Sequence, residues 1–210
     1  IIPEYVFLIP SLLKGLPEYQ KKCTMLDALC QAIESWWSIN STDESREYSR
    51  RAVSEIMENW EGYIFGNTEE ASEKMLEAAN YAGRAINITA TTAPHAMSYK
   101  LTTLYNIPHG HAVAVCLPEV WGYMLEHGEC CVDGRGAEYL KDTLNQIASF
   151  LTLDDFKSML HRLGLGYPVA TEKAEEMDLL ARSVHSARLK NNPVGLTMEN
   201  LKEMYGRIVK

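Results

Sequence analysis

The chain has 210 residues, with 20 basic and 28 acidic side chains and a formal net charge of −8 at pH 7. Hydrophobic residues make up 46% and charged residues 23% of the sequence, which is enough apolar material for a globular core and excludes an intrinsically disordered chain. The acidic balance, without a long basic run, argues against a nucleic-acid-binding protein, and no apolar stretch approaches the roughly 20 residues of a transmembrane helix.

The cysteines and the first residues indicate the compartment. The 5 cysteines are odd in number and two of them are adjacent, so we expect reduced thiols and no disulfide framework. The apolar residues 1–13 are interrupted by Pro3, Glu4 and Pro10 and lack the basic start of a signal peptide. We therefore expect a cytoplasmic protein without a membrane partner.

The N-terminal part of the chain predicts three helices after an irregular start. Residues 1–19 are rich in proline and are expected to be extended and turn-like. Apolar residues recur at three- and four-residue spacing over residues 24–37, which is the pattern of a buried helix. A cap signature at residues 41–44 begins a second helix that runs to about Ile64, and Thr68 caps a third with a face of small residues.

Two Pro-His steps mark the middle of the chain. A threonine-rich break at residues 89–92 leads into the first step, which ends at His95 and opens a helix to about Tyr105. The second step ends at His109 and precedes an apolar helix over about residues 112–124. The two histidines are thus expected at either end of one short helix.

The remaining residues predict further helices. The apolar helix is expected to be kinked or broken near Pro118, because proline removes a helical hydrogen bond. Three or four shorter amphipathic helices follow, with Asp154 and Thr197 near helix starts. Residues 5–9 are the one reasonable strand candidate and have no partner strand nearby. We therefore expect a single all-α domain over residues 1–210.

The residue pattern also indicates a metal site. His95 and His109 each follow a proline near a helix start, and side chains so placed converge between helices, where bundles build metal sites. Asp27 lies in an apolar stretch, where a carboxylate costs several kcal/mol unless it is paired or metal-bound. Gln31 follows one turn later on the same face. One carboxylate and two imidazoles suit Fe(II) or Zn(II), and Gln31 adds a neutral oxygen.

The pattern alone leaves an ordinary alternative open. Asp27 is then an early-helix acid stabilised by the helix dipole, and the histidines are unrelated to it and to each other. The other histidines considered, His127, His161 and His185, are expected to be surface or packed residues.

Four stretches in order resemble the signatures of a known family. Residues 27–34 resemble D-A-L-x-H-A-I-E, and residues 82–87 resemble A-G-x-A-F-x-N. Residues 95–101 resemble H-A-x-x-H-x-L, and residues 108–118 resemble P-H-G-x-A-x-A-x-x-L-P. In combination, the chain resembles the group III, iron-dependent alcohol dehydrogenase family over about residues 3–121, with a compatible helical tail.

The resemblance implies a fold and a ligand set. It implies the all-α metal and substrate domain of a dehydroquinate synthase-like dehydrogenase. The family's metal ligands correspond to Asp27, Gln31, His95 and His109, with Gln31 standing where the family signature has histidine. An amide oxygen is a poorer ligand than imidazole for Fe(II) or Zn(II).

The resemblance also implies residues that act on the substrate. Tyr99 stands where the second histidine of H-A-x-x-H is found, on the same helix face as His95. We expect Tyr99 and His109 to act catalytically at the reacting aldehyde or alcohol, with Tyr99 donating a hydrogen bond to a substrate oxygen. The alternative for Tyr99 is a packed tyrosine.

The family further implies an N-terminal α/β dinucleotide-binding domain, which this sequence is expected to lack. It contains no glycine-rich phosphate loop, so NAD(P)H is expected to bind through that other domain and cofactor-binding residues are not expected here. The chain alone is then expected to show no turnover, and a helical packing or dimerisation module is the alternative. The apolar helices around Trp36, Trp37 and Trp121 are candidates for the interdomain contact or for a homodimer interface.

Gln31, Lys100 and residues 188–193 resemble the phosphonoacetaldehyde reductase branch of the family. This implies reduction of phosphonoacetaldehyde to 2-hydroxyethylphosphonate in phosphonate metabolism. Lys100, Arg188 and Lys190 are cationic donors suited to a phosphonate, while the alternative is solvated surface charge. A general short-chain alcohol, lactaldehyde or propanediol dehydrogenase, which needs none of these cations, remains an alternative.

Overall fold

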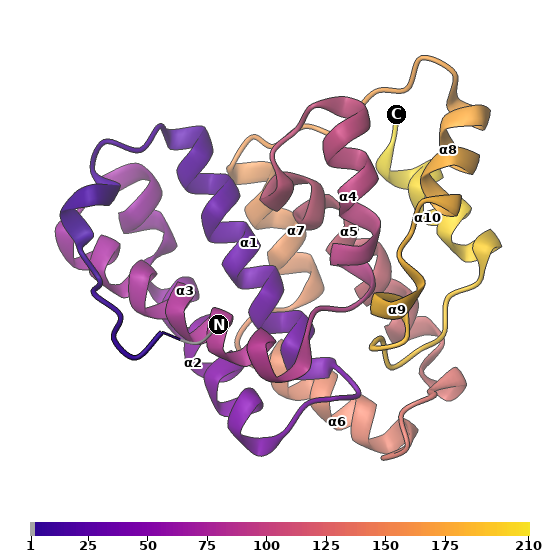
Figure 1. Cartoon of the computed structure of the whole chain (residues 1–210), viewed down its shortest axis with the longest axis horizontal. Coiled ribbons are helices and arrows are strands. Elements are labelled where there is room, and N and C mark those ends of the chain that lie inside the picture. The colour runs from indigo at the N-terminus through magenta and orange to yellow at the C-terminus, as the bar shows by residue number, and fades with distance from the viewer. Residues whose placement is uncertain (1–2) are drawn as a thin grey trace.

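The computed structural model describes residues 3–210, and over this range the chain forms ten α-helices and no β-strand, which confirms the all-α expectation (Figure 1). Single turns of other helix types occur at Pro10–Leu13, Gly62–Gly66 and Gly128–Cys130. The α-helices in chain order are α1 (Glu18–Trp37), α2 (Asp43–Glu61), α3 (Glu69–Thr89), α4 (Ala93–Tyr105), α5 (His109–Glu126), α6 (Ala137–Ala148), α7 (Leu153–Arg162), α8 (Lys173–Arg182), α9 (Ser186–Leu189) and α10 (Met198–Ile208).

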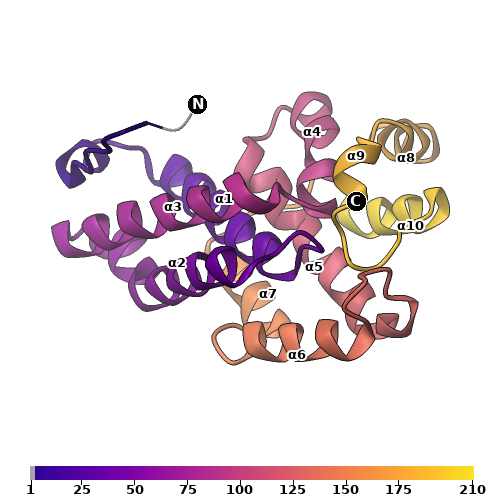
Figure 2. The same ribbon diagram turned by 60° about the horizontal axis from the view of Figure 1, so that its bottom comes forward.

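Helix α1 lies at the centre of the arrangement. It packs against the pair α2 and α3 on one side and against α5 on the other (Figures 1 and 2). Helices α8 and α10 form an outer layer against α4 and α5, while α7 packs on α5 and α6 packs on α1. Because other helices cover α1 from several directions, most of its residues are buried.

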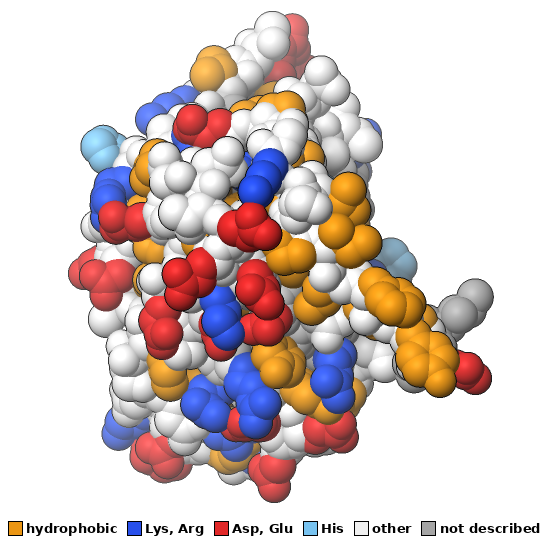
Figure 3. Space-filling view, turned by 90° about the vertical axis from the view of Figure 1, so that its left-hand side faces the viewer, with side chains coloured by type: hydrophobic (Ala, Val, Ile, Leu, Met, Phe, Trp, Pro, Cys, Tyr) orange, Lys and Arg blue, Asp and Glu red, His pale blue; other side chains and the backbone are white. Residues whose placement is uncertain are grey.

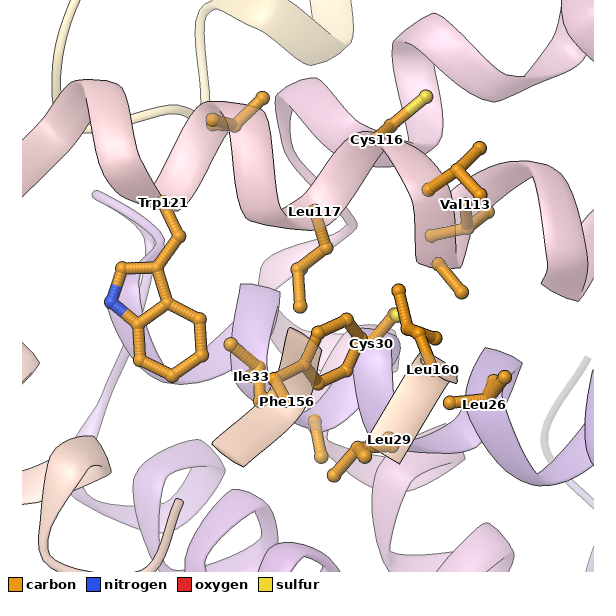
Figure 4. Packing of buried hydrophobic residues seen from close by; sticks show 14 of the residues in the cluster. Leu26, Leu29, Cys30, Ile33, Val113, Cys116, Leu117, Trp121, Phe156 and Leu160 are labelled. Carbon is orange, nitrogen blue, oxygen red and sulfur yellow. The ribbon is translucent and has the colours of Figure 1, made fainter. Parts of the chain in front are cut away.

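The core forms where α1, α5 and α7 meet. Leu26, Leu29 and Ile33 of α1 have no exposed surface and face Leu117 of α5 and Phe156 of α7 (Figure 4). Burying a side chain of this size stabilises the folded state by about 1.5–3 kcal/mol. A helix that is apolar on most of its circumference belongs in an interior, which is the position of α1.

The tryptophans belong to this interior. Trp36, Trp37 and Trp121 are at most 3% exposed within the chain itself, and the rings of Trp37 and Trp121 meet edge to face with centroids 5.9 Å apart. The three tryptophan side chains themselves offer little surface for an interdomain or subunit contact, because this chain already buries them.

The segment before α1 differs from expectation. Helix α1 begins at Glu18 directly after Pro17, earlier than the expected start at Thr24, because proline is compatible with a helix start and charged side chains cover the exposed first turns. The extended start is interrupted by the turn at Pro10–Leu13, and residues 5–9 form no strand. Residues 5–9 leave apolar side chains exposed, as at the right-hand edge of Figure 3, with Phe7 85% exposed.

Helix α5 also differs from expectation. It begins at His109 and continues through Pro118 without a break. Pro118 removes one backbone hydrogen bond, but the residue is buried, so packing against other elements holds the helix together around it. Within residues 3–210, no helix has both the length and the apolar character needed to cross a lipid bilayer.

Threonine caps begin four of the ten α-helices in residues 3–210. Thr42, Thr68, Thr152 and Thr197 each accept a hydrogen bond from the backbone N–H three residues later, an interaction worth about 1 kcal/mol. The expected role of Thr197 is confirmed, and Asp154 lies in the first turn behind Thr152. The tail contains α6 to α10, one more than expected, because α9 is a four-residue helix.

Helices α1 and α5 approach each other tightly at Gly110. A Cβ atom at this position would lie 1.9 Å from the Cys23 carbonyl oxygen and 3.0 Å from Cβ of Asp27. Only glycine fits there, because any other residue would collide with the backbone of α1. This contact holds Asp27 of α1 beside His109, the residue before Gly110.

We expect Gly110→Ala to lower the free energy of unfolding by about 1–3 kcal/mol, because the added methyl group forces α5 away from α1. Urea unfolding followed by circular dichroism measures this change. Gly83→Ala on the exposed face of α3, where an added Cβ meets nothing within 4 Å, is the matched control and should be neutral or slightly stabilising. Equal stability of the two variants would show that the approach of α1 to α5 tolerates a side chain.

Candidate metal centre

Three side chains from three helices meet beside this contact. Oδ1 of Asp27 lies 3.4 Å from Nε2 of His95 and 3.7 Å from Nε2 of His109. One potential ligand atom of each residue lies within 4.8 Å of the ligand atoms of the other two residues. The structure thus brings together the carboxylate and both imidazoles singled out in the sequence, from α1, α4 and the first residue of α5.

Two of these atoms are buried without a hydrogen bond. Within residues 3–210, Oδ1 of Asp27 and Nε2 of His95 have no hydrogen-bonding partner. A buried polar atom left unpaired costs free energy, and most such atoms in proteins are paired. A divalent cation bound between them satisfies both atoms, and a carboxylate with two imidazoles is a ligand set suited to Fe(II) or Zn(II). The residues therefore fit the metal implied by the sequence.

Glu34 lies behind His95 and was given no role in the sequence analysis. Its carboxylate has no exposed surface and accepts a hydrogen bond from Nδ1 of His95. The second oxygen accepts from the backbone N–H of Thr92 at 2.7 Å and from the Thr92 hydroxyl at 2.9 Å. A carboxylate bonded to the far nitrogen of an imidazole fixes its tautomer, so Nε2 of His95 is directed toward Asp27.

The signal for Glu34 was present in the sequence. It stands two helical turns after Asp27, on the same face of α1 and among apolar residues. A charged residue in that position requires a partner, just as Asp27 does. The partners are supplied by the segment from Thr92 to His95, and sequence spacing alone gives no indication that this segment packs there.

The two imidazoles differ in their protonation. Burial disfavours the charged form of His95, but attraction to Glu34 and Asp27 outweighs burial and raises the pKa of His95 to about 9. Burial lowers the pKa of His109 below its ordinary value despite the attraction of Asp27, so this imidazole is neutral at pH 7. Metal binding at Nε2 of His95 requires the proton to leave that atom, so binding strengthens as pH rises.

Tyr99 and Arg188 form a stack on the exposed side of His109. The rings of Tyr99 and His109 are nearly parallel, at 9°, with centroids 5.4 Å apart. The guanidinium of Arg188, from α9, lies 5.5 Å from the Tyr99 ring centroid and donates a hydrogen bond to the hydroxyl of Thr91. Burial raises the pKa of Tyr99, although Arg188 acts in the opposite direction, so the phenol keeps its proton at neutral pH.

The other two predicted cations are not part of this cluster. Lys190 is exposed at the end of α9, and Lys100 is half-buried on α4. In the described part of the chain, neither ammonium group forms an ion pair or a hydrogen bond with Asp27, His95 or His109. Of the three cations, only Arg188 reaches the aromatic stack beside the cluster.

Comparison with known proteins identifies the family. The model of the Fe-containing alcohol dehydrogenase family, C-terminal part, matches residues 22–209. The chain belongs to the iron-containing alcohol dehydrogenase family. It is 32% identical over 213 residues to phosphonoacetaldehyde reductase of Streptomyces viridochromogenes, covering 97% of this chain and 53% of that relative. It is 26% identical to 4-hydroxybutyrate dehydrogenase of Clostridium kluyveri, covering 97% of this chain and 57% of that relative.

Solved structures of the iron-containing alcohol dehydrogenase family share the fold. An iron-containing alcohol dehydrogenase from Thermotoga maritima superposes with a TM-score of 0.83 at 31% identity, covering 99% of this chain and 54% of that chain. A sulfoacetaldehyde reductase from Bifidobacterium kashiwanohense, solved in complex with NAD+, gives a TM-score of 0.81 at 27% identity, covering 95% of this chain and 52% of that chain. The chain therefore spans about half the length of the relatives that it matches.

We expect Glu34→Gln to weaken Zn(II) binding about 10- to 100-fold, the range typical of partners that orient metal ligands. The substituted amide presents an NH2 group to Thr92 or His95, where the wild-type residue presents only acceptor oxygens. Titration against a competing chelator measures the affinity. Glu126→Gln, at the exposed end of α5, is the control and should match the wild type. A Glu34→Gln protein with unchanged affinity would show that the carboxylate does not orient His95.

Proposed function

We propose that this chain is the metal- and substrate-binding half of an NAD(P)-dependent alcohol dehydrogenase that reduces a small aldehyde. The proposal is carried by the convergence of three potential ligand atoms at the site described above, two of them buried and without a hydrogen bond within residues 3–210. Asp27, His95 and His109 hold Fe(II) or Zn(II), which when bound polarises the aldehyde oxygen as a Lewis acid. The family relationship and the NAD+ complex of the sulfoacetaldehyde reductase support the nicotinamide cofactor.

The residues of this chain have separate tasks in the proposed reaction. Glu34 holds His95 in the ligating tautomer, and Gly110 keeps α5 close enough to α1 for His109 to reach the site. Tyr99 lies against His109 with a protonated phenol and donates a hydrogen bond to the substrate oxygen. The hydride comes from the nicotinamide, which is positioned by residues outside this chain.

We further propose that the substrate carries an acidic group, as phosphonoacetaldehyde does. Arg188 supports this, because a guanidinium held by Thr91 over Tyr99 offers further N–H donors beside the metal site. The names of the relatives point the same way, since phosphonoacetaldehyde, sulfoacetaldehyde and 4-hydroxybutyrate all carry an anionic group. Lys100 and Lys190 are proposed to contribute long-range attraction. A propanediol-type substrate has no group for Arg188 to bind.

The metal proposal is tested by metal content per chain, measured by mass spectrometry on protein purified without chelator or affinity nickel. We expect near-stoichiometric Fe or Zn, and its loss in Asp27→Ala and His109→Ala. His161→Ala, which removes an exposed histidine of α7, is the control and should retain the metal. Protein that stays metal-free after Fe(II) or Zn(II) is supplied would contradict the proposed mechanism.

The substrate proposal is tested by calorimetric binding of aldehydes to the metal-loaded protein. We expect Arg188→Ala to weaken binding of phosphonoacetaldehyde about 10- to 100-fold, the loss of one or two charge-assisted hydrogen bonds, and to leave butanal unaffected. Arg182→Ala, an exposed arginine of α8 paired with Asp178, is the control. An equal loss of affinity for both aldehydes would contradict anion recognition by Arg188. An unchanged affinity of Arg188→Ala for phosphonoacetaldehyde would favour an uncharged substrate.

A further inference from the structure

Gln31 occupies the position in α1 where the family signature has a histidine, one turn after Asp27. Its side-chain nitrogen Nε2 donates a hydrogen bond of 2.9 Å to Oδ2 of Asp27. An ionised carboxylate only accepts hydrogen bonds, so the amide of Gln31 must present its nitrogen, and not its oxygen, to that atom.

The two oxygens of Asp27 are thereby divided between two tasks. In the described part of the chain, Oδ2 is held by Gln31, while Oδ1 accepts no hydrogen bond and faces Nε2 of both His95 and His109. This is the arrangement found around many metals, in which a ligating carboxylate is oriented by a hydrogen bond to its other oxygen.

Coordination through the Gln31 oxygen requires a different amide orientation. Turning the amide over gives up the 2.9 Å hydrogen bond and places the amide oxygen against Oδ2 of Asp27, where two acceptors repel each other. The neutral amide oxygen is also a weaker ligand for Fe(II) or Zn(II) than the imidazole it replaces. The geometry therefore opposes Gln31 as a fourth ligand.

We propose that Gln31 is a positioning residue that orients Asp27, and that the metal site has three protein ligands, Asp27, His95 and His109. This rests on the proposed metal function and replaces the expectation that Gln31 itself ligates the metal. Three protein ligands are the number found in catalytic zinc sites, where the remaining position is open to water or substrate. The substitution of histidine by glutamine thus opens one coordination position.

Co(II) serves as the probe, because its visible absorption changes with the number and type of ligands. The variants are Gln31→Leu, which removes the donor at similar size, and Gln31→His, which adds an imidazole. Gln20→Leu, an exposed glutamine of the same helix, is the matched control. Affinities for Co(II) and Zn(II) are measured by titration, and circular dichroism verifies that each variant is folded.

For Gln31→Leu we expect the wild-type Co(II) spectrum with an affinity lower by about 10- to 100-fold, as for other residues that orient ligands. For Gln31→His we expect a changed spectrum and a higher affinity, because a fourth ligand enters the open position. Gln20→Leu should match the wild type in both measurements. If Gln31→Leu does not fold, Gln31→Ala takes its place with the same expected outcome.

Two results overturn the inference. A Co(II) spectrum that changes on removal of Gln31 would mean that the amide oxygen coordinates the metal, and an unchanged affinity would mean that the hydrogen bond to Asp27 has no effect. Both results leave the proposed metal function intact. Failure of the wild-type protein to bind Co(II) or Zn(II) at all would overturn the metal function and this inference together.

Discussion

The candidate site depends on the hydrogen bonds of one fully buried carboxylate, that of Glu34. A charge without exposed surface costs several kcal/mol unless it is paired. Within residues 3–210, the hydrogen bonds of the Glu34 carboxylate come from Thr92 and His95. The indole N–H of Trp37 donates to the same Thr92 hydroxyl at 3.0 Å, which connects this polar group to the hydrophobic core. The start of α4 is thereby fixed to α1, and the direction of the His95 imidazole follows from that attachment.

Two carboxylates and one bound divalent cation would balance each other at this site. Asp27 and Glu34 bring two negative charges, and both imidazoles are neutral once they act as ligands. Without a metal, the nearby carboxylates keep His95 protonated, as its raised pKa shows. A divalent cation bound here would compete with that proton for the same buried position, which is the behaviour expected of a metal centre assembled inside a helical domain.

Much of the fold and of the site was predictable from the sequence. Helix periodicity is a local signal, and the all-α fold that it predicts is confirmed. The structure also brings Asp27, His95 and His109 together, and their role as metal ligands stays a prediction. What the sequence did not show depends on packing between distant segments. The pairing of Glu34 with His95, the unbroken α5 and the position of Arg188 over Tyr99 all require knowledge of which surfaces meet. Lys100, by contrast, is next to Tyr99 in sequence yet has no polar contact with the described cluster.

The three candidate ligands come from helices that are brought together only by folding. In the unfolded chain, Asp27 and His95 are far apart along the sequence and form no common site. A metal that binds this cluster therefore binds the native state almost exclusively. Mass action then links occupancy to conformational stability, with about 1.4 kcal/mol gained for each tenfold excess of free metal over the dissociation constant. If the cluster binds a metal, the midpoint of thermal denaturation reports metal availability, and cells short of that metal would hold a larger unfolded fraction of this protein.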